Sequence, residues 1–273
     1  MSVTSFLTRV RNQPPKKRLY QAINELIVMT AGRPLKISHV LEYPKCGGTW
    51  VRNMVQTYLG GEAYLVNRMA NCNTVIHLHR KYSRRFSYPI VLFRDPRDVF
   101  VSYYFYEKAA IQSNQSLAIA KYFSFSRGLD TREEFVGYLD AKLRFTTDPY
   151  FSYKAFVDSW LKRNDVVYVY YENFKRAPEK ELQKIITHLG ETIDVQRLKY
   201  AVEHNSFENV TLRKYGVARK PGEEDSSKFQ RKGISGDWVN YFNHEARQIL
   251  DYHLGDVLLK LNYEKSRDWV HHG

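Results

Sequence analysis

The chain has 273 residues, of which 43% are apolar and 26% charged, which is typical of an ordinary globular protein. No segment approaches the roughly 18 consecutive apolar residues that a membrane span requires. The formal net charge of +13 favours a polyanionic partner, such as a nucleic acid, an acidic membrane or a multiply phosphorylated small molecule, although a solvated basic surface is an alternative.

The cysteine content and the first residues of the chain bear on the compartment in which we expect the protein. The two cysteines, Cys46 and Cys72, do not form a disulfide framework, so we expect a reducing, cytoplasmic location. The first residues lack the apolar core of a signal peptide, and residues 1–20 are expected to form a basic arm. Residues 1–273 are otherwise expected to form a single domain, and the sequence does not indicate its oligomeric state.

Hydrophobic periodicity predicts strands that alternate with helices along the chain. The predicted helices cover residues 15–33, 49–61, 151–163, 178–190, 194–204 and 243–261, with a further helix that starts after Asp95. The predicted strands are 36–43, 73–79, 89–93 and 165–171. This order predicts an α/β fold with a central parallel sheet and helices on both of its faces.

A glycine-containing turn joins the first predicted strand to the next helix. Gly47 and Gly48 allow close approach of an anion to the backbone, and the N–H groups of a helix start favour negative charge. Lys45 adds a cation and Thr49 a hydroxyl donor. The segment is therefore a candidate phosphate loop, although a plain structural turn remains possible, and it differs from the G-x-x-x-x-G-K-[ST] pattern.

Two further segments carry basic residues. Arg94 follows the continuous apolar strand 89–93, at the sheet edge where open α/β folds bind ligands, and Ser102 lies about two helical turns later. Asp95 and Pro96 fit the N-cap and first position of that helix. The third segment, 231–238, reads RKGISGDW, in which two cations precede a glycine. Taken alone, the Arg94 segment is also consistent with an exposed arginine beside a helix cap, and the 231–238 segment with a charged turn.

The three segments, taken in order, resemble the soluble sulfotransferase family between about residue 36 and residue 242. Residues 43–50, YPKCGGTW, are similar to that family's Y-P-K-S-G-T-T-W loop, with Cys46 and Gly48 in place of the usual Ser and Thr. Residues 94–104 resemble R-(N/D)-P-x-D-x-x-x-S-Y-Y, and 231–238 resemble R-K-G-x-x-G-D-W. The resemblance implies a nucleotide site of the strand–phosphate loop–helix type.

The resemblance also implies the ligand and the residues that bind it. The sulfuryl donor would be 3′-phosphoadenosine-5′-phosphosulfate (PAPS), with adenosine 3′,5′-bisphosphate (PAP) as the product and no metal required. Lys45 would contact the leaving-group oxygen, Trp50 would stack on adenine, and Arg97 and Asp98 would be a surface charge and a helix cap. The other donor-binding residues implied by the resemblance are Cys46, Gly47, Gly48, Thr49, Arg94, Ser102, Tyr171, Asn205, Phe207, Arg231, Lys232 and Gly233.

Two histidines alternate in the strand 73–79 and therefore face the same side. Without the family, His77 and His79 could be ordinary half-buried histidines or a metal pair, but no third ligand occurs at a useful spacing. By resemblance, His79 is the general base and His77 stands where a lysine is usual. Residues 105–155 are expected to shape the pocket for a small acceptor that carries a hydroxyl or an amine.

Two other classes of protein remain open. Cys46 and Arg52 have the C-x₅-R spacing of cysteine-dependent phosphatases, although Asn53 follows where those enzymes usually carry Ser or Thr. The net charge alone would also suit a basic nucleic-acid-binding module. Neither alternative explains the spacing of Lys45, Arg94 and Arg231.

Overall fold

The computed structural model describes residues 15–60, 70–126, 132–147, 149–211 and 232–271. Its elements, in chain order, are α2 (Pro15–Ala31), β1 (Ser38–Glu42), α3 (Gly48–Leu59), β2 (Val75–Leu78), β3 (Pro89–Phe93), α4 (Pro96–Gln112), η1 (Ala118–Lys121), α5 (Arg132–Arg144), α6 (Tyr153–Trp160), β4 (Val167–Tyr170), α7 (Tyr171–Arg176), α8 (Pro178–His188), α9 (Val195–His204), α10 (Phe207–Thr211), η2 (Asp237–Asn240), α11 (His244–Lys260) and η3 (Arg267–Val270).

The four strands form one parallel sheet in the order β2-β1-β3-β4. Every residue of β1 and β3 is buried, as expected for central parallel strands that are covered on both faces. Val40 of β1 pairs with His77 of β2, and Leu41 with Leu78, so both strands end at the same sheet edge. The predicted α/β fold with a central parallel sheet flanked by helices is confirmed.

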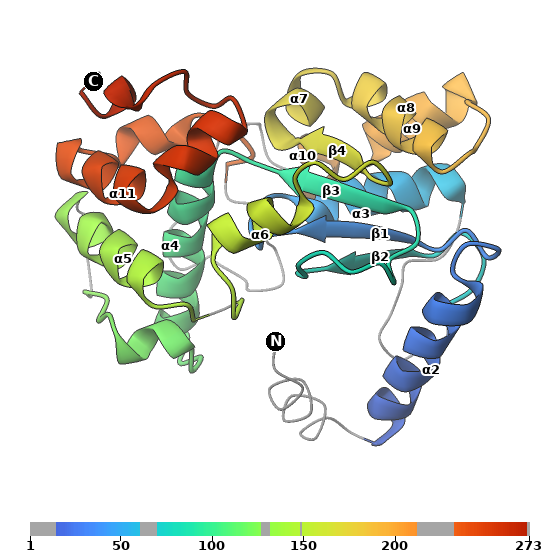
Figure 1. Cartoon of the computed structure of the whole chain (residues 1–273), viewed down its shortest axis with the longest axis horizontal. Coiled ribbons are helices and arrows are strands. Elements are labelled where there is room, and N and C mark those ends of the chain that lie inside the picture. The colour runs from blue at the N-terminus through green and yellow to red at the C-terminus, as the bar shows by residue number, and fades with distance from the viewer. Residues whose placement is uncertain (1–14, 61–69, 127–131, 148, 212–231, 272–273) are drawn as a thin grey trace. The chain divides into compact units, whose positions relative to one another are not determined.

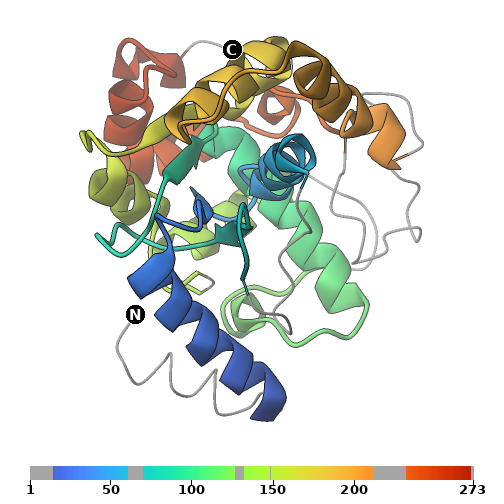
Figure 2. The same cartoon turned by 90° about the vertical axis from the view of Figure 1, so that its right-hand side faces the viewer.

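Residues Met1–Phe93 and Ser159–Ser206 form the first compact unit, which contains the whole sheet. Helix α3 packs against β1, β2 and α9, and α8 packs against β4 (Figure 1). Helix α2 extends away from the sheet in both views (Figures 1 and 2), and its Ile27 and Val28 contact a small core around Ile37 and Ile76. The carboxyl ends of the parallel strands therefore lie next to the start of α3.

Residues Arg94–Asp158 and Phe207–Gly273 form the second compact unit. Helices α4, α5 and α11 pack on one another there (Figure 1). The ring of Tyr104 contacts those of Phe135 and Tyr138, with centroids 5.5 Å and 5.4 Å away. Buried charges in this unit are paired, and Lys142 donates to Glu107 at 2.6 Å. Helices of this unit are thus packed on aromatic rings.

The predicted elements correspond closely to the observed ones. The helix after Asp95 begins at Pro96, and the Asp95 side chain accepts the N–H of Arg97, which confirms the predicted cap. In the part of the chain that the structure describes, no helix combines the length and the apolar character that crossing a bilayer demands. The predicted basic arm, residues 1–20, lies mostly outside the described residues.

Candidate functional site

The loop between β1 and α3 turns sharply because two of its residues adopt left-handed backbone conformations. Lys45 has φ 78° and Gly47 has φ 104°, and a non-glycine residue in this region is uncommon. A β-carbon at Gly47 would lie 2.8 Å from the ring of Tyr171, so only glycine fits. The N-cap position, Gly47, makes no side-chain cap to α3. The first turn of α3 therefore depends on groups outside its own cap residue to complement its N–H groups.

The cysteine of this loop is not placed like a nucleophile. Cys46 is fully buried, whereas reactive cysteines lie in partly exposed surroundings. Arg52 points its guanidinium to the side-chain oxygen of Asn53, at 2.7 Å from Nη2. These two observations weigh against the phosphatase alternative that the C-x₅-R spacing suggested.

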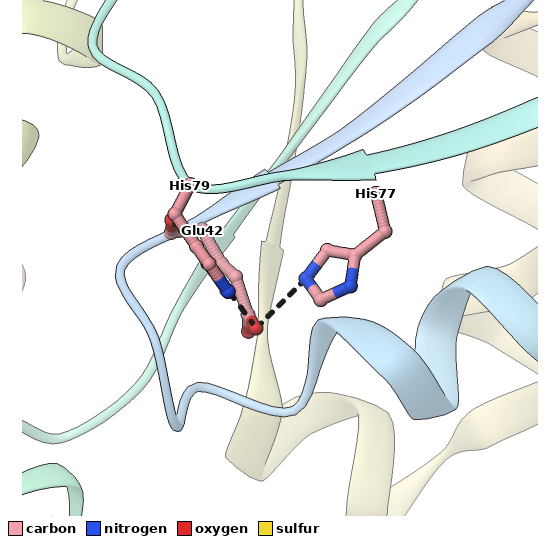
Figure 3. Close-up of side chains that lie close together, drawn as sticks. All are labelled: Glu42, His77 and His79. Atoms are coloured by element: carbon pink, nitrogen blue, oxygen red, sulfur yellow. Dashed lines mark hydrogen bonds and ion pairs between the residues drawn. The ribbon is translucent and has the colours of Figure 1, made fainter. Parts of the chain in front are cut away.

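A buried carboxylate lies beside the two histidines of β2. Glu42, the last residue of β1, is 3% exposed and brings Oε1 to 2.9 Å from His77 Nε2 and 3.9 Å from His79 Nδ1. Its other oxygen, Oε2, accepts the backbone N–H of Gly48 at 2.5 Å. Figure 3 shows the carboxylate between the two imidazole rings, whose centroids are 4.9 Å apart. One glutamate thus joins β1, β2 and the start of α3.

The acceptor atoms around the histidines define which ring nitrogens carry hydrogen. An ionised carboxylate only accepts, so His77 Nε2 donates to Glu42. A backbone carbonyl also only accepts, so His79 Nδ1, at 3.3 Å from the Glu42 carbonyl oxygen, donates as well. In its neutral form His79 therefore presents Nε2 as a lone-pair acceptor, and its side chain is 39% exposed.

The charge state of Glu42 follows from opposing effects. Burial alone would raise the pKa of its carboxyl, but the hydrogen bond from His77, the charges of His77 and His79 and the N–H of Gly48 together hold that pKa below its usual value. Glu42 is therefore ionised at neutral pH. The two histidines and the helix start surround a fixed negative charge.

The same three residues form the one set of potential metal ligands found in the described ranges. Ligand atoms of Glu42, His77 and His79 all lie within 4.8 Å of one another. The sequence showed no third ligand near the histidine pair, and the structure supplies Glu42 from 35 residues upstream of His77. Two histidines and a carboxylate are a donor set that zinc and iron use. The hydrogen bonds described above satisfy the same groups without a metal.

Three of the predicted nucleotide-binding residues, Trp50, Tyr171 and Asn205, lie together at the first turn of α3. The Trp50 ring lies 5.9 Å from Tyr171 and 5.0 Å from Phe174, and Lys175 Nζ lies 5.3 Å above it. Trp50 Nε1 donates to the backbone carbonyl of Asn205 at 2.7 Å. The Asn205 side chain is directed inward, where it donates to Thr57 and Ala201 and joins α9 to α3.

In the second unit, the segments 94–98 and 232–238 pack against each other. Asp98 accepts the backbone N–H groups of Gly236 and Trp238 at 2.7 Å and 3.0 Å. Arg94 Nη2 donates to the carbonyl of Ile234 at 3.3 Å and lies 4.0 Å from Asp98. Burial raises the pKa of Asp98, although Arg94 and the two N–H groups act in the opposite direction. Two predicted segments more than 130 residues apart in the chain are thus brought together.

The predicted roles of Arg97 and Asp98 were wrong in part. Arg97 is 3% exposed and is not a surface charge. Its guanidinium pairs with Asp95 and Glu264 and lies 4.0 Å above the Trp238 ring. These partners together compensate the desolvation of the buried charge. Asp98 holds the 232–238 segment, which is a longer-range role than a helix cap.

The remaining predicted residues of this unit occupy defined positions. Ser102 is half-buried in α4. Lys232 Nζ pairs with Asp237 at 3.0 Å, and Gly233 has φ 71° with its α-carbon packed on Phe207, where a β-carbon would lie 2.5 Å from the ring. Arg231 lies outside the described residues.

The features just described are those of an α/β protein in which a left-handed strand–loop–helix turn lies beside two histidines. The family model described as the sulfotransferase domain matches residues 87–262, which is well over half of the chain. The chain belongs to this sulfotransferase family.

Similar proteins agree with this assignment. Sulfotransferase 1B1 of Mus musculus is 35% identical over 109 residues, which are 37% of this chain and 36% of that protein. Sulfotransferase 1B1 of Canis lupus familiaris is 32% identical over 171 residues, which are 59% of this chain and 51% of that protein. The matches therefore span only about a third to a half of these two curated relatives.

Solved structures show the same fold over most of the chain. Mouse sulfotransferase SULT7A1, crystallised as a complex with PAP, has a TM-score of 0.62 at 18% identity and covers 92% of this chain and 94% of its own. Retinol dehydratase in complex with retinol and PAP has a TM-score of 0.58 at 17% identity, covering 88% and 86%. At 18% and 17% identity, the structural similarity establishes that the helices and strands are arranged in the same way.

The sequence interpretation missed Glu42. The residue ends a strand that otherwise reads as apolar and β-branched, and it precedes the candidate phosphate loop. A charged residue inside a buried strand needs a partner, and that requirement was the available signal. The partner was hidden because His77 becomes its neighbour only through the parallel pairing of β1 and β2.

Proposed function

We propose that this chain transfers a sulfuryl group from PAPS to a hydroxyl group of a small acceptor. The observation that carries the proposal is the loop between β1 and α3, whose left-handed turn leads to a helix start held by Glu42, the residue that also orients the partly exposed His79. Family membership supports the reaction class, and the PAP present in two similar structures supports the donor.

Each half of the donor would have its own binding residues. The N–H groups at the start of α3 and Lys45 would bind the 5′-phosphosulfate, and Trp50 would stack on adenine. Because the N–H of Gly48 already donates to Glu42, Lys45 and the N–H of Thr49 would carry a larger share of this contact. Arg94, Ser102 and the 231–233 segment would bind the 3′-phosphate through charge-assisted hydrogen bonds.

The chemistry would proceed by in-line attack. The acceptor oxygen forms a bond to sulfur while the bond between sulfur and the bridging oxygen breaks, and the electron pair stays on the phosphate of PAP. Nε2 of His79 takes the hydroxyl proton, since Nδ1 already carries hydrogen toward Glu42. Lys45 stabilises the charge that develops on the leaving oxygen.

The acceptor is proposed only as a class. The segment between residues 105 and 155 is rich in Tyr and Phe, which suits an apolar or aromatic alcohol. A reducing compartment would suit the free thiols of Cys46 and Cys72.

A transfer assay tests the function. Incubation with ³⁵S-labelled PAPS and 2-naphthol should yield a labelled sulfate ester and PAP in equal amounts. His79→Asn should lower kcat roughly 10²- to 10⁴-fold, the usual contribution of a positioned base. The control His204→Asn changes an exposed histidine at the end of α9 and should leave the rate unchanged. Phosphate release from p-nitrophenyl phosphate that disappears in Cys46→Ser would instead support the phosphatase alternative.

A further inference from the structure

The carboxylate of Glu42 lies in the candidate site, but the proposed sulfuryl transfer does not use it. It is buried, ionised and in contact with a backbone N–H of the candidate phosphate loop, where a bound phosphate would itself bring negative charge. An uncompensated carboxylate at that position would weaken anion binding. Its compensation comes from the two imidazole rings that lie on either side of it (Figure 3).

We propose that Glu42 is the positioning residue of the base, with its carbonyl and carboxylate fixing His79 with hydrogen on Nδ1 and stabilising the imidazolium formed during transfer. This inference rests on the proposed sulfuryl transfer. Proton uptake at Nε2 makes His79 cationic, and the carboxylate oxygen 3.9 Å from Nδ1 then faces a positive charge. The group that orients a catalytic histidine in other enzymes is often a carboxylate for the same reason.

The two contacts of Glu42 to His79 have different consequences. The carbonyl, at 3.3 Å from Nδ1, selects the tautomer whatever the charge of the side chain. The carboxylate adds a negative charge that favours the protonated ring. His77 competes for that charge, because its Nε2 lies nearer, at 2.9 Å. Glu42 from β1 and His77 from β2 are thus ionisable groups that face His79, and Lys45 follows in the adjacent loop.

Gly48 makes this arrangement possible. A β-carbon there would lie 2.5 Å from His77 Nε2 and 2.6 Å from the carboxyl carbon of Glu42. The missing side chain lets the carboxylate reach both the loop N–H and His77. Gly48, which stands where the family usually has threonine, therefore leaves the space that the Glu42 carboxylate occupies.

The test replaces Glu42 by its neutral isostere and reads out a pH profile. Glu42→Gln should lower kcat roughly 10- to 100-fold, a part of the contribution of a general base, with a change of less than about threefold in the KM for PAPS. The acidic limb of kcat/KM should move to lower pH by about one unit, because the base loses a neighbouring negative charge. The matched control is Glu181→Gln, a buried glutamate paired with Lys184 in α8, which should show neither effect.

Several results would overturn the proposal. One is a loss of rate in Glu42→Gln with the acidic limb unmoved, which indicates a structural role alone. Another is one Zn²⁺ bound per chain by calorimetry and lost in Glu42→Gln, since a metal on Nδ1 would displace the hydrogen. If Glu42→Gln does not fold, ¹⁵N imidazole spectra of the wild-type protein decide: hydrogen on Nδ1 of neutral His79 supports the proposal, and hydrogen on Nε2 contradicts it.

A failure of the role proposed for Glu42 can be distinguished from a failure of the proposed sulfuryl transfer. If the protein neither binds PAP nor transfers sulfuryl groups, yet His79 carries hydrogen on Nδ1 and its pKa falls in Glu42→Gln, the contact stands and the reaction is wrong. If transfer occurs and Glu42→Gln keeps the wild-type pH profile, the reaction stands and the positioning role is wrong.

Discussion

Gly48 donates its backbone N–H to the carboxylate of Glu42 at 2.5 Å, and the same glycine leaves no room for a β-carbon beside that glutamate. The start of α3 and the end of β1 are therefore held in direct contact through a residue without a side chain.

Gly48→Ala should consequently destabilise the protein. The new methyl group would overlap His77 Nε2 and the Glu42 carboxyl, and overpacking of this kind costs about 1–3 kcal/mol. Urea unfolding at pH 7 measures the change. Gly137→Ala, in α5, is the matched control, since its β-carbon would meet a single neighbour, the Phe123 ring, at 3.2 Å rather than two groups closer than 3 Å. Equal unfolding midpoints for Gly48→Ala and the wild type would contradict the packing described for this loop.

The buried acceptor Asp98 supports a second prediction. Asp98→Ala would leave the N–H groups of Gly236 and Trp238 without their acceptor, and an unsatisfied buried donor costs about 1–3 kcal/mol. Asp98→Asn keeps one acceptor oxygen, so its free energy of unfolding should fall less than that of Asp98→Ala. Hydrogen exchange at these two amides should accelerate in Asp98→Ala. Unchanged protection of both amides in that variant would show that the 232–238 segment is held by other contacts.

His39 in β1 should make stability depend on pH. Burial lowers its pKa to about 4, although Nδ1 contacts the Ser87 carbonyl at 2.9 Å. Between pH 4 and its ordinary pKa of about 6.5, the unfolded chain binds the proton that the folded chain rejects, so stability is complete above that range and falls as pH drops through it. The total contribution is about 3 kcal/mol.

His39→Gln isolates this contribution. The free energy of unfolding should fall less steeply between pH 6.5 and 4 in the variant than in the wild type, as measured by urea titrations at half-unit intervals. Parallel pH curves for the two proteins would mean that folding does not lower the pKa of His39, which would contradict the prediction.

The sequence predicted the order of strands and helices well because the signals are local. The continuous apolar run 89–93 coincides with β3, and Pro96 begins α4 as the proline rule for helix starts requires. The parallel sheet then followed from the alternation of strands and helices. The residues of the candidate phosphate loop were identified because glycine and lysine at a strand–helix junction have a local meaning.

Long-range partners could not be predicted in the same way. Arg97 was expected on the surface because its partners Trp238, Glu264 and Trp269 lie more than 140 residues later in the chain. Glu42 was missed because a parallel pairing brings His77 beside it. The partners of these buried charged residues are distant in sequence, so local sequence patterns could not predict them.

Calorimetric titration with PAP tests the central claim most directly, because two sets of residues distant in sequence are proposed to bind one nucleotide. We predict one PAP per chain, with affinity lowered at least about tenfold by Lys45→Ala and by Arg94→Ala, since each removes a charge-assisted phosphate contact. Lys184→Ala, an exposed lysine of α8, should bind as the wild type does. No binding of PAP to the folded wild-type protein, or equal affinity in all four proteins, would contradict the account.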